Sequence, residues 1–146
     1  MEAIAFLDLA NTLLQQKDCE ASLRTSIGRS YFALHNSLAT FFANNDLPLP
    51  KNFDKHAKIL LWLQNCGVSE VLEISRHLGA LRASRNNADY DMNTSKYNFP
   101  KLAELNYNRA IKAHDEFNKF ADVEQNRVKL RDGILQYEAK LKALKQ

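Results

Sequence analysis

The helix that decides the fold ends in the run Leu81-Arg82-Ala83-Ser84-Arg85-Asn86-Asn87-Ala88-Asp89-Tyr90-Asp91. The stripe leading into it has members spaced by 4, 3, 4 and 3 residues, namely Ile74, Leu78, Leu81, Arg85 and Ala88. This spacing places every member on one face of an α-helix. Arg85 therefore stands where an inward-facing leucine is expected, and a guanidinium there needs a hydrogen-bonded partner or an aqueous cleft.

Two residues of the same run lie near Arg85 on a helix. Asp89 is one turn further on and can form an ion pair with Arg85, and Arg82 is one turn back on the adjoining face. The sequence predicts that Arg85 is partly buried and paired with Asp89 or with a polar group across a dimer interface. A pair that only closes the helix end is one interpretation, and a binding or catalytic site is the favoured one.

The fold class follows from what the sequence lacks. Only four glycines and three prolines occur, and no segment alternates apolar and polar residues as a strand does. We therefore predict an all-α protein, an antiparallel up-and-down bundle of about five helices over residues 1–121. The expected helices are at about 2–16, 18–43, 54–65, 69–90 and 100–121, with Gly67 as the C-terminal cap of the third.

A C-terminal amphipathic helix is expected within residues 122–146. Its apolar residues keep heptad spacing, interrupted only at Arg127: Val123, Leu130, Ile134, Tyr137, Leu141 and Leu144. An isolated helix of this length is marginal in water, so this stripe should pack on the same domain or on another chain. The pattern leaves both possibilities open.

Composition excludes several classes of protein. With 146 residues, 45% hydrophobic and 25% charged, the chain is an ordinary globular domain rather than a disordered segment. A net charge of +3 is too small for a non-specific DNA binder. Cys19 and Cys66 lack metal-ligand spacing, and no histidine has a second ligand one turn away, so we expect neither metal nor cofactor. Glu2 near the N-terminus and the absence of a long apolar run predict a cytoplasmic protein without membrane association.

Two motifs carry a family resemblance. The run Leu23-Arg24-Thr25-Ser26-Ile27-Gly28-Arg29-Ser30-Tyr31-Phe32-Ala33-Leu34-His35 and the run Leu81–Asp91 resemble the paired motifs of HEPN domains (higher eukaryotes and prokaryotes nucleotide-binding), in the subgroup with an LRxxRNxADYD motif. The resemblance covers roughly residues 1–120. It implies a homodimer that binds RNA or a nucleotide, in a toxin–antitoxin or other defence system beside a nucleotidyltransferase or another nucleic-acid enzyme. On this resemblance, Arg82, Arg85, Asn86 and Asp89 would hold the nucleotide.

Catalytic members of that family cleave RNA without metal, using an arginine followed four to six residues later by a histidine. Arg85 and Asn86 match the first part of the motif, but Tyr90, Asp91 and Met92 stand where the histidine is expected. Tyrosine, with a pKa near ~10, is a poor base at neutral pH, and a carboxylate repels phosphate. We therefore favour a binding protein with a degenerate ribonuclease motif. The alternatives are an active ribonuclease using Arg85, Tyr90 and Asp91, and a helical adaptor that binds a protein through residues 122–146.

The first motif offers a second arginine and histidine. Arg29 and His35 have the bare spacing, but six residues on a helix separate their side chains by about 120°. His35 is instead predicted to pack on the inner face near Gly28 and Tyr31, and Gly28 to permit a close helix approach. Tyr31 and Phe32 are expected to belong to the core.

Overall fold

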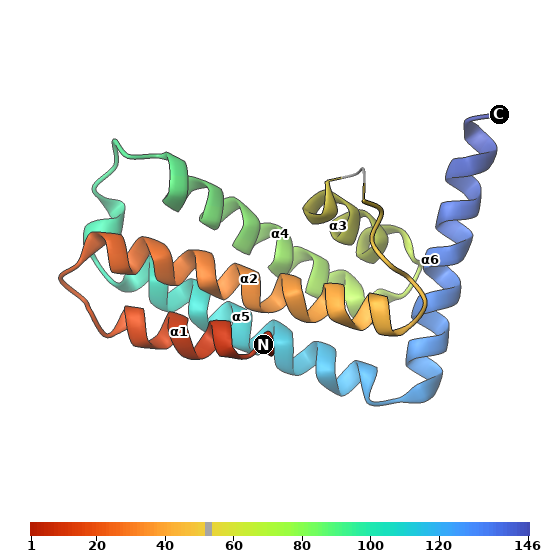
Figure 1. Cartoon of the computed structure of the whole chain (residues 1–146), viewed down its shortest axis with the longest axis horizontal. Coiled ribbons are helices and arrows are strands. Elements are labelled where there is room, and N and C mark those ends of the chain that lie inside the picture. The colour runs from red at the N-terminus through yellow and green to blue at the C-terminus, as the bar shows by residue number, and fades with distance from the viewer. Residues whose placement is uncertain (52–53) are drawn as a thin grey trace. The chain divides into compact units, whose positions relative to one another are not determined.

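The computed structural model of the protein describes residues 1–51 and 54–146, and this part of the chain is helical without a strand. Helices make up 78% of the structure. The α-helices are α1 (Ala5–Leu14), α2 (Glu20–Asn44), α3 (Lys55–Asn65), α4 (Ser69–Tyr90), α5 (Lys101–Ala121) and α6 (Glu124–Leu144), with a 3-10 turn η1 (Lys96–Asn98) before α5 (Figure 1). The predicted all-α class is confirmed, while the HEPN-specific arrangement stays a prediction.

The helix ends follow the local signals in the sequence. The Asp54 carboxylate accepts hydrogen bonds from the backbone N–H groups of His56 (2.9 Å) and Ala57 (3.2 Å), so it caps α3. After α3, Gly67 adopts φ +73°, the left-handed conformation that ends many helices. The predicted bounds of α3 and α4 are therefore confirmed.

The chain forms two compact units. Unit 1 comprises residues 1–37 and 77–114, and unit 2 comprises residues 38–76 and 115–146, so that α2, α4 and α5 each contribute to both. The units do not follow the expected division at residue 121, since the end of α5 and all of α6 group with residues 38–76. Because compactness does not show which part folds alone, the predicted division stays a prediction.

Unit 1 has an apolar core built by all of its helices. Its buried members come from α1, α2, α4, the turn η1 and α5: Leu14, Leu23, Ile27, Ala88, Tyr97 and Ala103. The hydroxyl of Ser26 donates to the backbone carbonyl of Ala10 (2.7 Å) and ties α2 to α1. Ile4 precedes α1 and is exposed, and Leu105 of α5 is half exposed.

In unit 2 the C-terminal helix packs against α3. Leu130 and Ile134 of α6 are buried, and the indole N–H of Trp62 donates to a carboxylate oxygen of Glu138 (2.6 Å). Lys58 of α3 forms an ion pair with the same carboxylate. The apolar stripe of α6 is thus used within the chain, although its outer members Val123 and Leu144 are exposed, contrary to the heptad pattern.

The contact between α3 and α6 should depend on pH. Burial acts to raise the pKa of Glu138, but hydrogen bonds from Lys58 and Trp62 and the charges of Lys58 and Lys142 outweigh burial, so its pKa lies below the ordinary value of 4.5. A carboxyl whose pKa is lowered by folding stabilises the folded state above that ordinary value, and the stabilisation is lost as pH falls through the folded value.

We therefore expect the fluorescence of Trp62, the only tryptophan of the chain, to change as pH falls below 4.5, because protonated Glu138 no longer attracts Lys58. The matched variant Glu138→Gln keeps the shape of the side chain without a titrating group. Its fluorescence should show no such transition. An identical pH profile in both proteins would show that another group is responsible.

Candidate functional site

The predicted pair of Arg85 and Asp89 is present in unit 1. The guanidinium Nε of Arg85 lies 2.8 Å from a carboxylate oxygen of Asp89, and the two side chains are 23% and 36% exposed. The prediction that Arg85 is partly buried and paired one turn further along α4 is therefore confirmed. The guanidinium remains within reach of a ligand from solvent.

This ion pair is not a well-directed hydrogen bond. The Nε atom is buried and, despite the short distance, its N–H points at no acceptor among the described residues. One terminal nitrogen of Arg85 donates to the amide oxygen of Asn86 at 3.2 Å, which is a long contact. Arg85 is thus held by charge rather than by well-directed hydrogen bonds.

The surroundings of Arg85 come from α2. Its guanidinium carbon lies 5.3 Å from the ring centroid of Phe32, within the range of a cation–π contact. A Cβ atom at Gly28 would meet Arg85 and Asp89 side-chain atoms at 4.0 Å, an ordinary contact. The expectation that Gly28 is needed for close approach is therefore wrong, because a methyl group fits. Phe32 is half-buried rather than a core residue, whereas Tyr31 is buried as expected.

The other predicted site residues lie on α4 but not together. Asn86 is exposed, Arg82 is half-buried, and Tyr90, one turn beyond Asn86, is 74% exposed. Five residues on a helix turn the side chain of Tyr90 by about 140° away from that of Arg85. The structure joins Arg85 to Asn86 and Asp89, but it does not bring Tyr90 to Arg85.

Asp91 follows the last residue of α4 and has a local role. Its carboxylate accepts a long hydrogen bond from the backbone N–H of Asn93 (3.3 Å), and its own N–H donates to the carbonyl of Asn87 (2.9 Å). Asp91 is exposed, and neither contact involves Arg85. Two of the three candidate catalytic residues, Tyr90 and Asp91, are thus exposed. Neither lies beside Arg85, where a general base would have to be.

Sequence reasoning missed the role of Arg24. This arginine of α2 is only 7% exposed, and its terminal nitrogen donates to the backbone carbonyls of Ala88 (2.7 Å) and Asp91 (2.9 Å). The carbonyl of Ala88 belongs to the last turn of α4, where no intrahelical donor remains, and that of Asp91 follows directly after the helix. Arg24 therefore caps the end of α4 that carries Arg85 and Asp89.

Two further contacts hold Arg24 in place. Its Nε donates to a carboxylate oxygen of Glu20 (2.7 Å), and its guanidinium carbon lies 4.4 Å from the ring centroid of the buried Tyr97. One signal could have revealed it: Arg24 shares a helix face with Ile27 and Tyr31, three and seven residues on, so it points inward. His35, one turn beyond Tyr31, is buried and stacks on that ring, as predicted.

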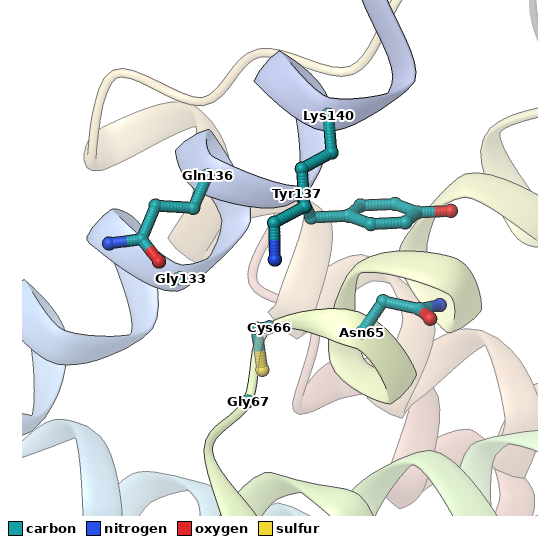
Figure 2. A pocket seen from close by; sticks show the side chains of 7 residues that line it. All are labelled: Asn65, Cys66, Gly67, Gly133, Gln136, Tyr137 and Lys140. Atoms are coloured by element: carbon teal, nitrogen blue, oxygen red, sulfur yellow. The ribbon is translucent and has the colours of Figure 1, made fainter. Parts of the chain in front are cut away.

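A separate hollow of about 270 Å³ lies in unit 2, where α6 passes the end of α3 (Figure 2). Its lining residues are Asn65, Cys66, Gly67, Gly133, Gln136, Tyr137 and Lys140. Figure 2 shows the side chain of Lys140 extending from α6 toward the end of α3. Burial raises the pKa of the Cys66 thiol, so this sulfur is a poor nucleophile at neutral pH. The hollow contains none of the predicted site residues.

Comparisons with protein-family models, with curated proteins and with solved structures found no match. Within residues 1–51 and 54–146, no three His, Cys, Asp or Glu side chains are grouped as metal ligands would be. Nor does any helix there combine the length and the apolar composition needed to cross a bilayer.

Proposed function

We propose that the protein binds RNA or a nucleotide through the end of α4, as a HEPN-type protein with a degenerate ribonuclease motif. The observation that carries this proposal is the partly exposed Arg85, held between Asp89 and Phe32 by imperfect contacts. A guanidinium offers two parallel N–H groups to a phosphate, which an ammonium cannot do.

The amide of Asn86 adds specificity to this surface. Its oxygen accepts from Arg85 and its side chain is exposed, so its NH₂ group can donate to a phosphate or to a base edge. Arg82, one turn before Asn86, supplies a second positive charge on the adjoining face of α4. Asp89 keeps Arg85 in place when no ligand is bound and opposes the ligand's charge, so we expect weak, salt-sensitive binding.

The biological setting is proposed from the motif resemblance. A homodimer would place two such helix ends at one cleft. A hydrated interface accommodates polar residues on an otherwise apolar stripe better than the core of a monomer does. A toxin–antitoxin or defence system with a neighbouring nucleotidyltransferase or other nucleic-acid enzyme is the setting we propose. Light scattering that returns the mass of one chain at high concentration would exclude the dimer.

The first test measures binding of a fluorescent single-stranded RNA. Arg85→Gln removes the charge and should weaken binding roughly tenfold, the loss of about 1.4 kcal/mol expected for one charged contact. Arg76→Gln is the matched control, because Arg76 lies on the same helix, is 68% exposed and pairs with Glu73 one turn back. Equal affinity of wild type and Arg85→Gln would refute the role of Arg85.

The second test asks whether the protein cleaves RNA. We expect end-labelled RNA to stay intact in the absence of metal, because Tyr90 points away from Arg85 and Asp91 is bound only to nearby backbone. Specific fragments formed by wild type and absent with Arg85→Ala would establish the active ribonuclease instead. Fragments formed equally by both proteins would indicate a contaminating nuclease.

The adaptor alternative concerns α6. Its buried face is used against α3, so an adaptor would have to use the opposite side, where Val128 and Leu135 are half exposed. Retention of a partner protein by the full chain, lost when Val128 and Leu135 are both changed to Lys, would favour this alternative over RNA binding.

A further inference from the structure

Arg29 on α2 is a second arginine close to the α4 surface, and no function has been assigned to it above. Its guanidinium carbon lies 5.6 Å from the ring centroids of both Phe6 of α1 and Phe32 of α2. Among the described residues, no carboxylate forms an ion pair with it. Arg29 is half-buried, so its charge is held against two rings and is still open to solvent.

Arg85 shares one of these rings. Phe32 lies 5.6 Å from the guanidinium carbon of Arg29 and 5.3 Å from that of Arg85, so the two guanidinium carbons are less than about 11 Å apart. Two positive charges this close repel each other, and an aromatic ring offsets only part of that cost. Asp89 compensates the charge of Arg85, whereas the contacts of Arg29 are with the rings of Phe6 and Phe32.

We propose that Arg29 and Arg85 together hold two successive phosphates of a single-stranded RNA, with Phe32 fixing the separation of the two guanidinium groups. This inference rests on the proposed function and names its ligand class and a further binding residue. The anionic RNA backbone supplies the negative partner that Arg29 lacks within the described residues. The partly exposed guanidinium planes of Arg29 and Arg85 also offer surfaces on which unpaired bases stack.

Single-stranded RNA fits this surface better than a duplex does. The bases of a duplex are stacked on one another, so they cannot stack on arginine side chains. A free mononucleotide has its phosphate groups at one end and cannot place one at each arginine while its base stacks between them. The ligand class is therefore an unpaired strand of at least two nucleotides.

The test is the salt dependence of binding to an unstructured oligouridylate. Each phosphate neutralised on a single strand contributes about 0.7 to the slope of log affinity against log salt. We expect Arg29→Gln and Arg85→Gln each to lower the slope by about 0.7, and Arg76→Gln to leave it unchanged. Arg29→Lys keeps the charge, so it should retain the wild-type slope. A duplex RNA of the same length should bind more weakly than the single strand.

The outcomes separate this inference from the proposed function. If wild type binds no oligouridylate, both fail. If Arg85→Gln lowers the slope and Arg29→Gln does not, the proposed function stands and the role of Arg29 is refuted. If Arg29→Gln lowers the melting temperature but leaves the slope unchanged, Arg29 only stabilises the fold, and the inference is likewise refuted. Equal or tighter binding of the duplex refutes the single-strand assignment.

Discussion

Replacing Arg24 with methionine should lower the free energy of unfolding by about 2–4 kcal/mol. Methionine keeps the apolar stem against Tyr97 but removes the donor for the carbonyls of Ala88 and Asp91. A buried acceptor left without a partner costs about 1–3 kcal/mol. Glu20 is 45% exposed and regains water when its partner is lost, so it adds little to this cost.

Urea denaturation followed by circular dichroism measures this effect. Arg76→Met is the matched control, because Arg76 also pairs with a glutamate on its own helix but is largely exposed, and its loss should cost less than about 1 kcal/mol. Arg24→Lys should recover only part of the stability, since one ammonium cannot reproduce the planar geometry of the guanidinium. Similar midpoints for Arg24→Met and Arg76→Met would mean that the end of α4 does not depend on Arg24.

Arg24 also connects stability with the proposed site. The carbonyls that it caps belong to the turn carrying Asp89, and Asp89 in turn holds Arg85. Fraying of this turn would release both. A loss of RNA affinity in Arg24→Met would therefore act through positioning, and it should leave the slope of affinity against salt nearly unchanged because Arg85 and Arg29 keep their charges.

The features that sequence alone predicted are local ones. Arg85 and Asp89 are one turn apart on one helix, and Gly67 follows closely after the end of α3, so both features follow from the local sequence. The contact of Arg24 with Ala88 joins residues 64 positions apart. No periodicity contains that information, because a buried arginine on a helix face does not indicate which carbonyl it meets.

Two helical glycines also show that the local sequence does not reveal contacts with distant parts of the chain. Gly28 and Gly133 both lie inside helices, and the sequence singled out Gly28 for a close helix approach. Space for a Cβ atom depends on an element distant in the chain: at Gly28 the nearest atoms are 4.0 Å away, and at Gly133 the carbonyl oxygen of Cys66 is 2.0 Å away. Likewise, the heptads of α6 predicted an apolar face but could not show that α3 of the same chain covers it.

The second large effect is expected at Gly133. In Gly133→Ala, the new methyl group would stand 2.0 Å from the carbonyl oxygen and 3.0 Å from the carbonyl carbon of Cys66, and both are backbone atoms that cannot turn aside. The helix α6 must therefore move away from the end of α3. Overpacking of this kind costs about 1–3 kcal/mol, which exceeds the gain of up to about 1 kcal/mol from replacing glycine with alanine in a helix.

The movement should be visible at Trp62, whose indole N–H donates to Glu138 five residues beyond Gly133 on α6. We expect Gly133→Ala to shift the Trp62 emission and to lower the urea midpoint. Gly28→Ala makes the same chemical change inside a helix with room for the methyl group, so it should leave the midpoint unchanged or raise it. If the same substitution changes stability in opposite directions at the two helical glycines, the difference comes from the contact with Cys66 and not from helix propensity. A stabilised Gly133→Ala protein would show that α6 does not lie against the carbonyl of Cys66 in solution.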